Sequence, residues 1–213
     1  MKARNTIPFL TIFFIFIAFV CFNCKPQKSK EQILHEKITQ DSTAAIFQNF
    51  TSDSLSDSTI RAFESRAIQK ISDLRDYISI LSDTSLDKTF KQQARAMALK
   101  LFISKNCTLP SPLNSGDEII KISDLLDSLK SGSAENLRLS VNSTDISEHA
   151  QKQEKTYQGI VIFDMRYKGG EVRFREKTKV QCTFSIKKTK KAFGKETKLI
   201  WEVFLGNIEI IKN

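Results

Sequence analysis

One side chain in this sequence stands out as a candidate for acid–base chemistry, the carboxylate of Glu176. Between residues 172 and 186, apolar residues occupy most even positions and polar residues the odd ones, which is typical of a strand with one buried face. Glu176 falls on the apolar side, where a carboxylate costs free energy unless it has a partner. A general base in a pocket would explain this place. A position at the rim of the sheet or in a bulge explains it equally well and is the commoner arrangement.

The other residues that could carry chemistry lack the neighbours they would need. His35 and His149 are the only histidines, and neither has a cysteine or carboxylate at a spacing typical of zinc sites. The sequence contains no glycine-rich phosphate loop and no Gly-x-Ser-x-Gly turn. We therefore predict a protein that is not an enzyme and that uses no metal and no cofactor.

The beginning of the chain has the layout of an export signal. Lys2 and Arg4 are positive, and the mostly apolar segment from Asn5 to Cys24 carries no charge. A basic start, an apolar run and a polar exit are typical of exported proteins. The basic flank stays in the cytoplasm, so everything after Lys25 is expected to be exported.

The end of this segment resembles a bacterial lipoprotein signal, in which a cysteine that closes the apolar run is acylated and becomes the new amino terminus. Cys24 is the first choice, because the polar stretch after it would make a tether, and Cys21 is the second. The sequence departs from the pattern at Asn23, where a small residue is preferred. An uncleaved anchor helix and an ordinary cleaved signal remain alternatives. We predict a protein tethered to a membrane of a bacterial cell envelope.

The net charge of +9 is concentrated in the carboxy-terminal part, because residues 156–198 carry far more Lys and Arg than Asp and Glu. The odd positions of the alternating stretch form a basic row, which consists of Arg173, Arg175, Lys177 and Lys179. The row would solvate the outer face of a sheet, or it would dock an anionic partner such as anionic lipid, an acidic glycan or an acidic protein. No nucleic acid is expected, because the row has no interleaved aromatic residues and the protein is exported.

Apolar spacings of three and four residues predict helices in the first part of the chain. They cover residues 31–50 and, most regularly, 57–82. The apolar stripe of the second helix is expected to face the core. Its opposite side carries Arg61, Arg66, Lys70, Arg75 and Asp76.

Three shorter elements are expected next. Thr84 with Asp87 resembles a capping box, which would open a helix that ends near Lys105. A short strand is expected at 118–122, followed by a helix over 125–130 that Ser123 would cap.

From residue 135 the apolar period changes to two, which predicts four strands; they are expected near 137–141, 157–167, 172–186 and 197–211. A polar bend is expected over residues 147–155. Gly169-Gly170 would form a two-residue hairpin turn, which places Tyr157 opposite Cys182. Helices followed by antiparallel strands predict an α+β fold with the helices on one face of the sheet.

This element order resembles the NTF2-like (cystatin-like) fold, in which amino-terminal helices pack on one face of a curved four-stranded antiparallel sheet. The predicted organisation is a signal or anchor (1–24), a tether (25–31) and a single domain (32–213), whose helical part is 32–110 and whose mainly stranded part is 117–213. Such folds often keep a pocket between sheet and helices. The resemblance therefore makes Tyr157, Tyr167 and Trp201 candidates for its lining.

Two cysteines remain if Cys24 is acylated, Cys107 and Cys182. A single pair so far apart in sequence gives no disulfide framework. Unpaired and half-buried thiols are expected.

The predicted function is a membrane-tethered lipoprotein that acts as a non-catalytic binding or assembly module of the cell envelope. Two alternatives stay open. One is a small-ligand-binding or isomerase/lyase-type protein that uses Glu176 as a pocket carboxylate. The other is a single-span subunit of an envelope transport machine.

Overall fold

The computed structural model describes residues 54–112, 118–132, 135–169, 177–194 and 196–211. All of them belong to one compact unit, Asn49–Asn213. The signal segment, the tether and the helix expected over 31–50 lie outside the described residues. So do Arg173, Arg175 and Glu176.

The long helix α3, Asp57–Ser82, has the bounds that its apolar spacing predicts. It begins where the side chain of Ser56 accepts a hydrogen bond from the Thr59 amide at 3.3 Å. Most of its apolar stripe is fully buried, as Ile71 and Leu74 show, and Ile60 near its start is partly buried. With about 1.5 Å of rise per residue, its 26 residues extend roughly 39 Å, long enough to cross the sheet.

The sequence prediction for the next helix is wrong at both ends. Helix α4 covers Lys88–Leu99, and its cap is Asp87, whose side chain accepts from the Phe90 amide at 2.9 Å. Phe90, Ala94 and Met97 have the spacing of an apolar stripe, but Phe90 and Met97 are 45% and 47% exposed. Ala94 of this stripe is buried as its spacing predicts, together with Ala98.

A small antiparallel sheet pairs β1, Thr108–Pro110, with β2, Ile119–Lys121. Strand β2 confirms the short strand expected there, and β1 was not predicted. Helix α5, Ile122–Lys130, follows without a side-chain cap, so the proposed Ser123 cap is wrong. Arg95 of α4 and Asp127 of α5 join the two helices through contacts of 2.6 and 2.7 Å.

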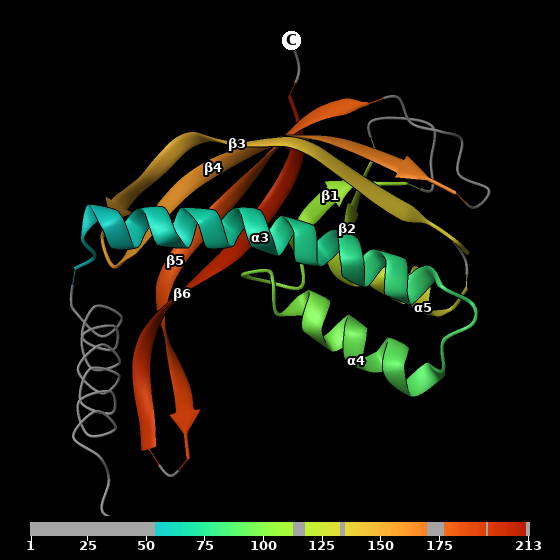
Figure 1. The fold of residues 1–213 in the computed structure, drawn as a ribbon, viewed down its shortest axis with the longest axis horizontal. Helices are drawn as coiled ribbons and strands as arrows, with labels where there is room; N and C mark the ends of the chain where they lie inside the picture. The colour runs from blue at the N-terminus through green and yellow to red at the C-terminus, as the bar shows by residue number, and fades with distance from the viewer. Residues whose placement is uncertain (1–53, 113–117, 133–134, 170–176, 195, 212–213) are drawn as a thin grey trace, which may run out of the picture. The chain divides into compact units, whose positions relative to one another are not determined.

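The main sheet has four antiparallel strands in the order β3-β4-β5-β6. Their bounds are β3 Arg138–Gln153, β4 Thr156–Lys168, β5 Thr178–Phe193 and β6 Glu196–Ile210. Helix α3 runs across this sheet (Figure 1). The α+β class is confirmed, and helices that precede an antiparallel sheet match the layout that the NTF2-like resemblance implies.

The two faces of the sheet are those that the alternation predicts. Val180 and Phe184 of β5 and Phe163 of β4 are buried. Lys177 and Lys179 are exposed. The apolar face therefore looks toward the helices, because burial of its side chains outweighs the cost of ordering them.

The predicted register between β4 and β5 is wrong by four residues. Tyr157 pairs with Ile186 and Phe163 with Val180, whereas the two-glycine turn would place Tyr157 opposite Cys182. The connection is therefore longer than two residues. Because the error is an even number, every side chain keeps its predicted face.

Strand β3 runs through the stretch expected to be a polar bend. It keeps pairing with β4 by means of register shifts between Asn142 and Asp145, and on either side of Glu148. Such irregularities bend a strand and increase its twist. At Gly159 of β4 a side chain has no room, since a Cβ there would lie 2.5 Å from the ring of Phe184.

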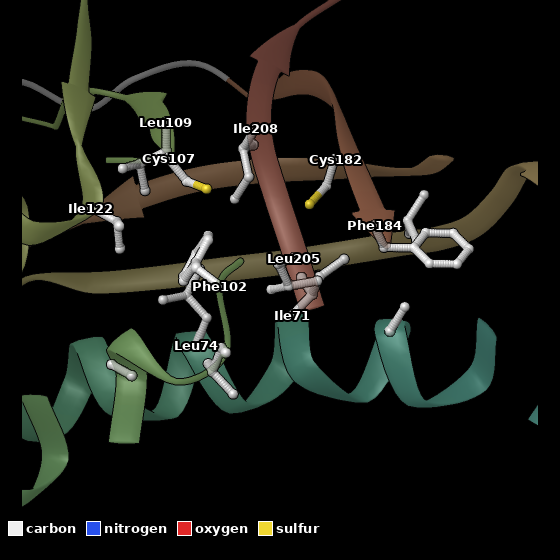
Figure 2. Packing of buried hydrophobic residues seen from close by; sticks show 14 of the residues in the cluster. Ile71, Leu74, Phe102, Cys107, Leu109, Ile122, Cys182, Phe184, Leu205 and Ile208 are labelled. Carbon is white, nitrogen blue, oxygen red and sulfur yellow. The ribbon is translucent and has the colours of Figure 1, made fainter. Parts of the chain in front are cut away.

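Figure 2 shows the core between α3 and the strands, where Phe102 and Leu205 lie next to Ile71 and Leu74. Cys107 and Cys182 are both free and fully buried, rather than half-buried as expected. Burial raises the pKa of Cys182 to about 12.

Candidate functional site

A cavity of about 470 Å³ lies where α3, the end of α4 and the β5–β6 hairpin meet. In Figure 1 this hairpin extends past α3 on the side where α4 lies. The chain after α4 is fixed there by backbone pairing with β6. The Ile103 amide donates to the Leu205 carbonyl at 2.8 Å, and the Leu205 amide donates to the Leu101 carbonyl at 2.8 Å.

Helix α3 supplies one wall through Arg66, Lys70, Asp73 and Tyr77. This spacing of three and four residues places them on one stripe, directly beside the stripe that packs in the core. Lys70 is 6% exposed, so its place on the solvent side of the helix was predicted wrongly.

Apolar and aromatic side chains form much of the remaining wall. Leu101 and Phe102 come from the segment after α4, Met97 from its last turns and Phe204 from β6. The ammonium of Lys70 lies over the ring of Phe204, 5.3 Å from its centroid. A cation at this distance from a ring face is attracted by the ring quadrupole.

The carboxylates of the wall already have partners. Asp73 accepts a hydrogen bond from Gln69 at 3.0 Å and lies 3.6 Å from Arg66. Glu202 accepts from the Thr189 hydroxyl at 3.0 Å and from Lys191 at 3.1 Å.

Lys70 is left as the buried cation of the site. Among the residues that the structure describes, no ion pair joins it to a carboxylate. Burial lowers the pKa of Lys70, Glu202 opposes this effect, and the positive charges of Arg66 and Lys191 lower the pKa further. The arrangement can therefore hold a negative group beside an apolar surface.

The tyrosines and the tryptophan expected in a pocket pack in the core, and none of them lines this cavity. The Tyr157 hydroxyl accepts from the Leu55 amide at 3.0 Å, and its ring meets Trp201 edge-on at 5.5 Å. The Tyr167 hydroxyl donates to the Pro110 carbonyl at 3.1 Å.

Two members of the predicted basic row are described by the structure, Lys177 and Lys179, and they lie on the outer face of the sheet. Lys177 contacts Asp164 at 2.8 Å, and this hydrogen bond lowers the pKa of Asp164. In the ladder Asp164 is paired with Lys179. Arg175, which the two-glycine turn would place opposite Asp164, lies outside the described residues. Lys177 and Lys179 do not line the cavity.

A buried carboxylate that sequence reasoning missed lies elsewhere on α3. Glu64 accepts from the Ala150 amide at 2.8 Å and lies 3.2 Å from Nδ1 of His149. His149 belongs to β3 and its side chain is 78% exposed. This contact ties α3 to the sheet where β3 is irregular.

The described ranges contain no group of three or more His, Cys, Asp and Glu residues that could hold a metal ion. None of their helices combines the length and the apolar character that crossing a membrane requires.

No family model and no curated protein matches the chain. Among solved structures, it is similar to the epoxide hydrolase/cyclase-like enzyme SalBIII, described for its role in pyran ring formation in polyether salinomycin. The identity is 13%, the TM-score is 0.24, and the match covers 70% of this chain and 98% of that one. A likeness at this level carries no argument about the function of this chain.

The sequence gives a weak signal for the cavity. Lys70 follows the buried Ala67 by three residues and precedes Ile71 by one, so it lies at the border of the apolar stripe. A border residue becomes buried only if another element covers it. Here that element is the β5–β6 hairpin, which starts more than 100 residues later in the chain.

Proposed function

We propose that this chain is an exported, membrane-tethered binding protein that takes a small ligand in the cavity beside α3. The observation that carries the proposal is a cavity of about 470 Å³ with a buried lysine in its wall. Small-molecule sites are typically concave, mostly apolar and about 300–1,000 Å³ in volume, with few polar groups that fix orientation.

The proposed role is binding without catalysis. A general base must reach the proton that it removes. Asp73 and Glu202 are the carboxylates in the described wall, and both are engaged by neighbouring side chains. Use of Glu176 by an isomerase or lyase remains the alternative, and that residue lies outside the described ones.

The tether is part of the same proposal. The apolar segment that ends at Cys24 supports acylation of this cysteine and attachment to a membrane of a bacterial envelope. The intact mass of the protein extracted from membranes tests this. We expect an acylated species that begins at Cys24, whereas a full-length mass would favour the single-span alternative.

Native mass spectrometry of the full chain, purified with its bound small molecules, tests the ligand site. We expect a bound mass in the wild type that is lost in Met97→Trp, because Met97 lies at the cavity and is exposed enough to accept a large side chain. Phe90→Trp is the matched control, since Phe90 is similarly exposed on the same helix but does not line the cavity. An unchanged bound mass in Met97→Trp would reject this site.

A further inference from the structure

We propose that the ligand is an organic anion with an apolar body, whose anionic group binds the ammonium of Lys70. This inference rests on the proposed function, because it names the chemical class that the same cavity takes.

The charges of the described wall do not balance. Four basic side chains line the cavity, namely Arg66, Lys70, Lys100 and Lys191, against two acidic ones. Arg66 and Lys191 are the basic residues that contact those carboxylates. The surplus therefore belongs to Lys70 and Lys100, and a ligand with a negative charge would compensate it.

Because Lys70 is buried, its ammonium can favour a negatively charged ligand over a neutral one. Its residue is 6% exposed, so burial removes part of the bulk water that would otherwise solvate its ammonium. The ring of Phe204 contributes a weak attraction to Lys70 on one side, and the ammonium of Lys187 lies 5.0 Å from the centroid of the same ring. A buried ammonium without a carboxylate partner gains more from an arriving anion than an exposed one does.

The rest of the wall favours an apolar body over a small inorganic ion. Phe204, Tyr77, Leu101 and Phe102 provide aromatic and aliphatic surface next to Lys70. The volume of about 470 Å³ lies within the roughly 300–1,000 Å³ of small-molecule sites, so the cavity has room for an organic ligand. Inorganic phosphate would leave most of this surface without contact.

Equilibrium dialysis with the full chain in phosphatidylcholine nanodiscs tests the inference, with empty nanodiscs as the blank. The probes are biphenyl-4-carboxylate, the neutral biphenyl-4-methanol and the cationic biphenyl-4-methylamine, which share one apolar body. We expect the carboxylate to bind at least about tenfold more tightly than the alcohol, as for a hydrogen bond to a charged group. Biphenyl-4-methylamine is expected to bind most weakly.

Lys70→Met keeps an unbranched side chain, one atom shorter than that of lysine, and removes its charge. We expect it to abolish the preference for biphenyl-4-carboxylate while biphenyl-4-methanol still binds. Lys190→Met is the matched control, since Lys190 is exposed on β5 and does not line the cavity. Lys100→Met, at the exposed end of the site, is expected to weaken carboxylate binding by a smaller factor.

The outcomes separate the two proposals. Equal binding of biphenyl-4-carboxylate and biphenyl-4-methanol to the wild type would overturn the anion inference but leave a ligand site in place. A preference that survives in Lys70→Met would overturn the role of Lys70. The proposed function fails separately, through the Met97→Trp comparison. The wild-type comparison of probes decides the anion inference even if Lys70→Met does not fold.

Discussion

Replacement of Glu64 by alanine should destabilise the domain by about 2 kcal/mol, because it leaves a backbone donor buried without a partner. The Ala150 amide donates to Glu64 Oε1 at 2.8 Å, at a point where β3 and β4 shift register between Glu148 and Gln151. Ala150 itself is 8% exposed, so water cannot readily replace the carboxylate.

The magnitude follows from the two contacts of Glu64. An unsatisfied buried donor costs about 1–3 kcal/mol. The contact with the largely exposed His149 adds less, about 0.5 kcal/mol at most. For a domain of this size, about 2 kcal/mol corresponds to a decrease in Tm of roughly 4–8 °C.

Urea unfolding followed by circular dichroism measures the change, and hydrogen exchange at the Ala150 amide locates it. Glu64→Gln keeps an acceptor oxygen and should lose less than about 1 kcal/mol. Glu148→Ala is the matched control, because Glu148 is an exposed glutamate of β3 and should change stability by less than about 0.5 kcal/mol. If Glu64→Ala is no less stable than Glu148→Ala, the role of this contact is refuted.

Three further predictions concern other parts of the domain. Gly159→Ala should lower the free energy of unfolding in urea by about 1–3 kcal/mol, because its Cβ would lie 2.5 Å from the Phe184 ring and 2.7 Å from the Glu148 carbonyl oxygen. Gly206→Ala should lower it by less, because the added Cβ would meet mainly the side chain of the exposed Thr183. The hydrogen bond from Arg95 lowers the pKa of Asp127 in the folded protein. The pair therefore stabilises the folded state above the usual carboxyl pKa, and this stabilisation is lost as the pH falls through the lowered pKa. Asp127→Asn should therefore be less stable at pH 7 by about 0.2–1 kcal/mol, given the exposure of the pair, and equally stable in strong acid; a difference that persists in acid would contradict this. Site-resolved iodoacetamide labelling should leave Cys107 and Cys182 unmodified in the folded protein and modify both in urea, since both are buried and the pKa of Cys182 is raised to about 12; rapid labelling of the folded protein would show that the core opens.

Much of the architecture could be predicted because it depends on local patterns. The apolar residues of α3 recur with helical spacing over the whole segment, and a polar N-cap, Ser56, precedes it, so both ends of the helix were correct. In β4 and in the first part of β5, alternate side chains are buried, and this assignment does not change when the register shifts by an even number of residues. The predicted buried faces are therefore correct although the predicted register of the hairpin is wrong by four residues.

The predictions that are wrong concern burial and strand shape that depend on contacts with elements distant in the sequence. Phe90, Ala94 and Met97 have the spacing of a core stripe, but of these three α4 buries only Ala94, together with Ala98. The irregularities of β3 likewise depend on its partner strand and on Glu64 of α3. Polar spacing alone indicated a bend there.

The helical front, the stranded back and the buried face of each strand follow from the periodicity of apolar residues along the chain. The enclosure of Lys70 and the cavity next to it depend on the packing of distant elements. Burial of a residue at the border of a helix stripe requires another element that covers it. Here the cover is Phe204 of the β5–β6 hairpin, which the fold brings to α3 from a distant part of the sequence.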